Sequence, residues 1–345
     1  MKNSIFKLVG VMCIAILPIL LLLYSYKNQL EKKSYSFTRK IIYPLERMDR
    51  VKLDRESYYL AGVASEEIYL ANNYNTGWML SFDQNLKQKK IKLNLSKANL
   101  VKDKGQYRAH ISDGRFYLYN GLGRSILSGT LEAWTAFNYP IFTPYFQDAV
   151  AMGAESIVFR YVNSRTGQNS ILKTTYNDKL ENINLLQKQV DGLYCTSGML
   201  KYNKALNKLI YLYYYRNQIL QIDTNLNLAA ITNTIDPIDS VKFTSATIKS
   251  ENKMVQTSPP ILVNAHCATW GNYLYVHSKV MGRREDNRKF DNAAVIDVYD
   301  LKLGSYLHSF YLHNQNKTAI SDLLVDGNVL YTISGQYLNK YTLER

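Results

Sequence analysis

The chain has 345 residues, 46% of them hydrophobic, so it can form a sizeable core in one large domain or two ordinary ones. Its 29 tyrosines and only 7 prolines favour strands. The formal net charge is +14, but the like charges are not gathered into long runs, which predicts a solvated basic surface and argues against a nucleic-acid partner.

The N-terminal segment predicts a membrane helix. Residues 8–26 carry no charged side chain, and about 20 apolar residues span a bilayer as a helix. No A-x-A-like cleavage site follows, and Cys13 lacks the small preceding residue of a lipoprotein cysteine. We therefore expect a retained transmembrane anchor at residues 1–27 and a linker at residues 28–34. A removed signal peptide is the alternative.

Two features of the sequence predict opposite orientations of this anchor in the membrane. More basic residues follow the apolar segment than precede it, which by the positive-inside rule keeps the body of the chain in the cytoplasm. A short leader with Lys2 and Lys7 before an apolar run is instead typical of export signals. We expect export, and the cytoplasmic orientation stays open.

The rest of the chain contains an internal repeat. Its unit is a turn, an apolar run with an aromatic residue at its centre, and a second strand that ends near an Asp-x-x-Leu turn. The central aromatic residues of the six copies are Tyr69, Tyr117, Phe159, Tyr211, Tyr275 and Tyr331. Their mean spacing is about 52 residues, a period typical of β-propeller blades.

The copy around Tyr211 shows why blades are favoured over an open sheet. Along residues 209–215 both alternating faces are apolar or aromatic, so both must be covered, as they are between neighbouring blades. Of its four tyrosines, Tyr211 and Tyr213 are expected to pack. Tyr214 should point the other way, and only Tyr215, at the hairpin end, should reach solvent.

The chain ends predict how the ring closes. The sixth copy reaches the C-terminus without room for a fourth strand, so residues 35–45 are expected to supply the outer strand of the last blade. The predicted fold is therefore an all-β, six-bladed β-propeller at residues 35–345, preceded by one transmembrane helix. Residues 236–260 and 282–292 are expected to be surface insertions.

The repeat resembles a known class of proteins. The stretches "LLQKQVDGLYCTSGMLKYNKALNKLIYLYYYRNQ" and "AAVIDVYDLKLGSYLHSFYL" are similar to a group of uncharacterised bacterial envelope proteins. The blades resemble membrane-anchored six-bladed propellers of the TolB-like type. This resemblance implies a single-pass protein of the bacterial inner membrane with its propeller in the periplasm. It implies no activity and no catalytic residues.

Candidate ligand residues come from the short run that precedes each copy, because such runs predict the innermost strands around a propeller's axial channel. The candidates for a channel or ligand-binding site are Arg108, His110, Asp148, His266 and Asp322, with Tyr58 and Asn264 also on these runs. If His110, His266 and Asp322 converge, they could bind a metal ion or act as acid and base. The alternative is that they fill a polar, hydrated channel.

Other chemistry is less supported. Cys195 and Cys267 could pair only if the fold brings them together, and no cysteine spacing predicts a zinc site. We expect no cofactor. Two functions remain: a non-catalytic envelope propeller that binds a protein, peptide or glycan, or a hydrolase or lyase that acts at the mouth of the channel.

Overall fold

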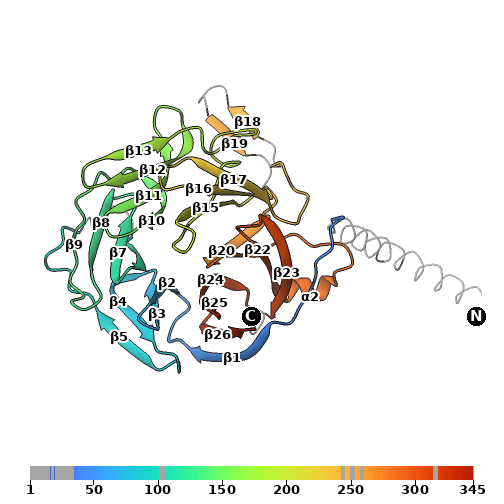
Figure 1. Ribbon diagram of the computed structural model, residues 1–345, viewed down its shortest axis with the longest axis horizontal. Coiled ribbons are helices and arrows are strands. Elements are labelled where there is room, and N and C mark those ends of the chain that lie inside the picture. Colours follow the sequence, from blue (N-terminus) through green and yellow to red (C-terminus); the bar gives the residue numbers. More distant parts are fainter. Residues whose placement is uncertain are drawn as a thin grey trace, which may run out of the picture.

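The computed structural model describes residues 35–100, 106–241, 260–313 and 318–344, the backbone of residues 245–248 and 253–256, and the single residues Ile16 and Ile19. The described chain forms six antiparallel four-stranded sheets arranged in a ring, and one separate two-stranded sheet (Figure 1). The predicted all-β, six-bladed propeller is therefore confirmed.

Each blade has the same strand order from the axis outward. The first strands contact one another from blade to blade around most of the ring. They are β2 (Tyr58–Ala64), β6 (Arg108–Ser112), β10 (Phe146–Ala151), β14 (Gly198–Asn203), β20 (Asn264–Trp270) and β24 (Ile320–Asp326). The second strands carry the repeated aromatic residues and are β3 (Glu67–Asn72), β7 (Arg115–Asn120), β11 (Ser156–Asn163), β15 (Lys208–Tyr213), β21 (Tyr273–Ser278) and β25 (Val329–Ser334).

The outer half of each blade consists of a third and a fourth strand. The third strands are β4 (Asn75–Phe82), β8 (Ser125–Thr130), β12 (Gln168–Thr175), β16 (Gln218–Ile222), β22 (Ala293–Asp300) and β26 (Tyr337–Leu343). The fourth strands are β5 (Gln88–Lys92), β9 (Phe137–Asn138), β13 (Lys179–Asn182), β17 (Leu228–Asn233), β23 (Ser305–His313) and β1 (Leu45–Lys52). Most of these fourth strands have one exposed face, so they tolerate charged residues.

The ring closes between the two ends of the chain, but not with the predicted segment. Strand β1 pairs antiparallel with β26 as the fourth strand of the last blade (Figure 1). The prediction of residues 35–45 for this strand was wrong. The outer strand is exposed to solvent along most of its length, so the charged sequence LERMDRVK can form it. The more apolar residues 35–44 are used elsewhere.

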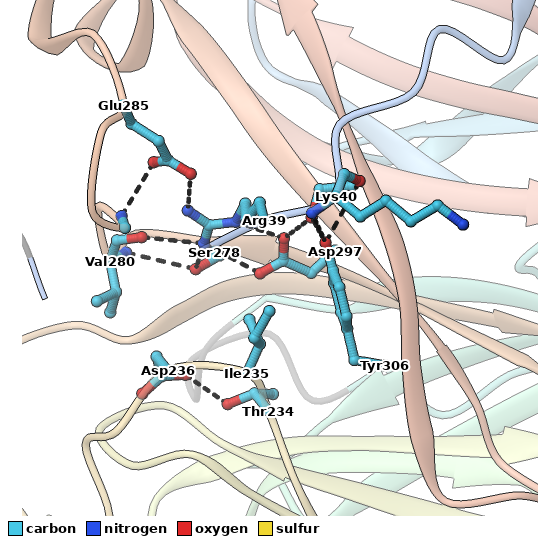
Figure 2. Close-up of polar contacts among 12 residues, drawn as sticks. Arg39, Lys40, Thr234, Ile235, Asp236, Ser278, Val280, Glu285, Asp297 and Tyr306 are labelled. Carbon is cyan, nitrogen blue, oxygen red and sulfur yellow. Dashed lines mark hydrogen bonds and ion pairs between the residues drawn. The ribbon is translucent and has the colours of Figure 1, made fainter. Parts of the chain in front are cut away.

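Residues 35–44, which we call the N-terminal strap, lie along the blade of β20–β23. Tyr35 N donates to Met281 O at 2.9 Å, and Ile41 forms a parallel bridge with Ser309. Tyr35 and Phe37 pack on a small hydrophobic cluster of this region. Figure 2 shows how Arg39 of the strap reaches into the blade, where Asp297 and Glu285 bind its guanidinium.

The core lies between the blades. Tyr211 belongs to a cluster shared with the preceding blade, whereas Ile210 and Leu212 belong to a cluster shared with the following one. The prediction that both faces of this strand are covered is therefore confirmed. Tyr211 and Tyr213 are buried. Tyr214 and Tyr215 are both half-buried.

Both predicted insertions carry small elements of their own. The first contains the hairpin of β18 (Ser245–Ile248) and β19 (Lys253–Gln256), and the second contains α2 (Asn287–Asp291). Within the described ranges, no helix is both long enough and apolar enough to cross a membrane. The predicted anchor at residues 1–27 and the linker at 28–34 lie outside the described residues, apart from Ile16 and Ile19.

Candidate functional site: the axial cavity

The first strands surround a cavity of about 580 Å³, which we call the axial cavity. All five candidate residues line it: Arg108, His110, Asp148, His266 and Asp322. Two further residues considered with them do not. Tyr58 lines a small pocket at the side of its own blade, and buried Asn264 donates to the carbonyl oxygens of Tyr213 and Arg216.

A second cavity of about 230 Å³ lies at the C-terminal ends of the first strands. The two cavities share four lining residues, namely His110, Val150, Lys201 and Cys267. These side chains therefore lie between the two halves of the channel. Whatever enters the axial cavity meets His110 and Lys201 at its inner end.

The two carboxylates of the axial cavity connect neighbouring blades. Asp322 Oδ2 accepts from Leu60 N at 2.9 Å, in the next blade of the ring. In the same way, Asp148 Oδ2 accepts from Leu200 N at 3.2 Å. Both aspartates directly follow an irregularity in strand pairing, where an extra residue changes the direction of the side chain. Each carboxylate thus has a structural role.

Three cationic side chains line the same cavity from three consecutive blades. They are Arg108 on β6, Arg160 on β11 and Lys201 on β14. The Arg108 guanidinium lies 4.4 Å from the centre of the Tyr59 ring. Within the described ranges, none of the three forms an ion pair within 4.0 Å. The cavity therefore presents positive charge that the described chain leaves unneutralised at close range.

Arg160 and Lys201 were missed in the sequence. Lys201 directly follows residues 193–200, the segment whose sequence predicts the first strand of this blade, but the strand continues to Asn203. Arg160 belongs to a second strand, whereas the predicted candidates all come from first strands. Its signal was available, because it is the one charged residue in the apolar run SIVFRYVN and it pairs across the strands with Asp148.

Burial keeps the histidines of the cavity neutral at neutral pH. It lowers the pKa of His110 to about 4, and the positive charges of Lys201 and Arg108 act in the same direction. Burial also lowers the pKa of His266, which the nearby Asp322 carboxylate partly opposes. The His266 ring stacks on His277 with 5.5 Å between ring centres. His266 and Asp322 are therefore neighbours, whereas the charges that act on His110 are those of Lys201, Arg108 and Asp113.

The side chains of the axial cavity are better suited to donate hydrogen bonds to a ligand than to act as metal ligands or nucleophiles. In the part of the chain that the structure describes, no group of three or more His, Cys, Asp or Glu side chains is placed to hold a metal ion. Cys195 and Cys267 are free and buried, and burial raises the pKa of Cys267 to about 11. The cavity has aromatic walls at Tyr59, Tyr119 and Tyr214, so Tyr214 is the tyrosine of the 211–215 run that faces a ligand site. Tyr215, the tyrosine expected to reach solvent, is half-buried and does not line this cavity.

Comparisons with known proteins support the fold. No protein-family model matches the chain, and no curated protein matches it by sequence. Among solved structures, it is similar to a member of the DUF4221 family from Bacteroides vulgatus, with a TM-score of 0.54, 12% identity and coverage of 89% of this chain and 98% of that one. It is also similar to a streptogramin B lyase, with a TM-score of 0.51, 11% identity and coverage of 86% and 98%. At these identities the similarity shows the fold alone: the chain is a six-bladed β-propeller.

Proposed function

We propose that this protein is a non-catalytic binding propeller whose ligand site is the axial cavity. The ligand is a small molecule or a projecting group of a protein, peptide or glycan partner. The observation that carries the proposal is the wall of the cavity, where three cationic side chains from three neighbouring blades line a space of about 580 Å³. A cavity of this volume can hold a small molecule or a single projecting group, but not a folded domain.

The alternative, a hydrolase or lyase, is less well supported by the same side chains. Acid–base catalysis needs a group that exchanges its proton near the working pH. His110 is held neutral by burial, with a pKa of about 4. Asp322 already accepts hydrogen bonds from Leu60 N and Leu323 N. The lyase fold similarity does not transfer an activity.

Retention at a membrane is part of this proposal. The uncharged residues 8–26 support an uncleaved anchor in the bacterial inner membrane, with the propeller in the periplasm. The strap would then hold the propeller near the anchor. Carbonate extraction of native membranes should leave the protein in the pellet, and protease added to spheroplasts should degrade the propeller. Release by carbonate, or protection until lysis, would overturn this part.

The binding site is tested by blocking the cavity. Gln147 is an exposed residue of the axial cavity wall, at the irregularity before Asp148, so Gln147→Trp should fill the mouth without disturbing the core. Gln88→Trp makes the same change on the exposed outer strand β5 and is the matched control. The three full-length proteins serve as bait in detergent extracts of native membranes.

The proposal expects a molecule that is captured by the unmodified protein and by Gln88→Trp but not by Gln147→Trp. Circular dichroism must show that both variants fold. Capture that survives the blocked cavity would place the binding surface elsewhere. Absence of any specific molecule from all three baits would remove the support for a binding protein.

A further inference from the structure

We propose that the axial cavity recognises an oxyanion, either a carboxylate or a phosphate, through Arg160 and Lys201. This inference rests on the proposed function, since it names the ligand chemistry of the same site. Two residues that were not among the predicted candidates thus become the main recognition residues. Arg108 completes the set at a more exposed position.

Arg160 is the most buried of the three cationic residues of the axial cavity. Its side chain is buried, with the residue only 9% exposed, and its Nε atom makes no hydrogen bond within the described chain. Asp148 lies opposite it in the strand register, but the two do not form an ion pair within 4.0 Å. A buried charge without a counter-charge is unfavourable, and folded proteins pair such groups. A bound anion would supply the missing partner.

Lys201 brings a second positive charge to the same space. It makes no ion pair with the residues that the structure describes, and it lies at the junction of the two cavities. It lines the axial cavity together with His110 and His266, and its charge contributes to lowering the pKa values of both imidazoles. An anion between Arg160 and Lys201 would therefore also meet neutral imidazoles, which can donate a hydrogen bond.

The negative charges of the cavity do not compete for this role. Asp148 and Asp322 are each bound to a backbone N–H of the next blade, so their positions are fixed. Among the ionisable residues of the wall, three are cationic and two are acidic, and the histidines are neutral because of burial. Guanidinium and ammonium groups bind carboxylate and phosphate by short, charge-assisted hydrogen bonds.

The experiment uses matched pairs of probes that differ in charge. Benzoate is compared with benzamide, and phenyl phosphate with phenol, so each pair keeps the same ring. Binding to the full-length protein is measured by ligand-observed NMR and by titration calorimetry. We expect at least one anion to bind about tenfold or more tightly than its neutral counterpart. The stronger of the two anions distinguishes a phosphate site from a carboxylate site.

Arg160→Gln should weaken binding of the preferred anion about tenfold or more. Lys89→Gln removes one positive charge from the exposed outer strand β5 and should leave binding unchanged, which separates the site from the general basic charge of the protein. Because Arg160 forms no ion pair within 4.0 Å among the described residues, Arg160→Gln should fold with unchanged or increased stability. Lys201→Gln, at a half-buried position, is a second and independent binding test, and it should weaken binding of the same anion.

Four outcomes would overturn the inference. Equal binding of charged and neutral probes, blocked by Gln147→Trp, would leave a ligand site without anion selectivity, and the proposed function would stand. Equal weakening by Lys89→Gln would show non-specific attraction. A strongly destabilised Arg160→Gln protein would show that Arg160 is a structural residue. Absence of anion binding at millimolar concentration would also exclude an oxyanion site, while the capture experiment decides the proposed function separately.

Discussion

The Nε atom of Arg39 donates to Oδ1 of Asp297 across 2.7 Å, although the two residues are 258 positions apart in the chain (Figure 2). Both side chains are almost fully buried, and Glu285 accepts a second bond from the same guanidinium at 2.6 Å. Burial alone would lower the pKa of Arg39, but the charges and hydrogen bonds of Asp297 and Glu285 raise it above its ordinary value. The N-terminal strap is thereby fixed to its blade by a buried charged group in addition to its backbone hydrogen bonds.

Replacing Arg39 should therefore destabilise the propeller strongly. Arg39→Met leaves Asp297 and Glu285 without their counter-charge, and breaking a buried pair in this way costs about 3–5 kcal/mol. Urea unfolding at neutral pH measures this loss. Arg47→Met is the control, because Arg47 pairs with Asp49 at the surface, where such a pair contributes about 1 kcal/mol or less. Equal effects of the two changes would contradict the structural role of Arg39.

The strap should also become accessible before the propeller unfolds. A segment held by few buried contacts needs less free energy to open locally than the core needs to unfold, and it opens more easily still when one of those contacts is removed. In Arg39→Met we expect trypsin to cleave after Lys40 under conditions in which the unmodified chain stays intact there. Mass spectrometry of the first fragments identifies the site. First cleavage within a blade would show that the strap does not depend on Arg39.

Ring closure can be tested with a disulfide between the chain ends. Asp49 on β1 and Lys340 on β26 are opposite each other in an antiparallel pair, a spacing that matches the Cα separation of disulfides. Asp49→Cys with Lys340→Cys should oxidise and raise the unfolding temperature, because the bridge closes almost the whole chain into one loop. Asp49→Cys with Asn339→Cys should not bridge, since neighbouring strand residues point to opposite faces. Equal oxidation of the two pairs would contradict the register.

The repeat was predictable because one physical requirement recurs in every blade. Second strands such as that around Tyr211 are covered on both faces, so their apolar character is visible in the sequence. The closing strand was not predictable in the same way, because its charged sequence suits a solvent-facing edge. The strap carries Tyr35, Phe37 and Ile41, and its apolar pattern therefore looked like the missing strand.

The candidate site was partly predictable for a related reason. First strands all face the axis, so their polar residues, including His110 and Asp322, could be assigned to one cavity without knowing the distances. Strand periodicity does not show which polar side chain already has a partner. Asp322 has a backbone partner in the next blade, whereas Nε of Arg160 has none among the described residues, and both facts depend on contacts between residues far apart in the sequence.

Asp322 should therefore affect stability more than its place in the cavity suggests. Asp322→Ala leaves Leu60 N and Leu323 N without their acceptor and should cost about 2–3 kcal/mol. Asp326→Ala, on the same strand, is the matched control: burial raises the pKa of Asp326, so its charge is disfavoured and its removal should change stability by less than about 0.5 kcal/mol. Chemical denaturation compares the two. Equal losses would remove the assigned link between blades.

Buried histidines should make the propeller sensitive to acid. His277 is 3% exposed, and burial, followed by the charges of Lys279 and His266, lowers its pKa to about 3. Its ordinary pKa in the unfolded chain is about 6.5, so between these values the unfolded chain binds more protons. The stability that the neutral His277 side chain contributes is therefore fully present above about pH 6.5 and is lost as the pH falls. For one such group, the free energy of unfolding should decrease by about 2 kcal/mol between pH 7.5 and pH 5.

His277→Phe tests this linkage, because the ring remains available to stack on His266 while the titrating group is lost. The free energy of unfolding should be close to that of the unmodified protein at pH 7.5, since Nδ1 of His277 has no hydrogen-bond partner within the described chain. At pH 5 the variant should be the more stable by about 2 kcal/mol. Val276→Ala, at the buried neighbouring position, should lower stability equally at both pH values. If His277→Phe and the unmodified protein lose the same stability between pH 7.5 and pH 5, His277 is not a source of the acid sensitivity.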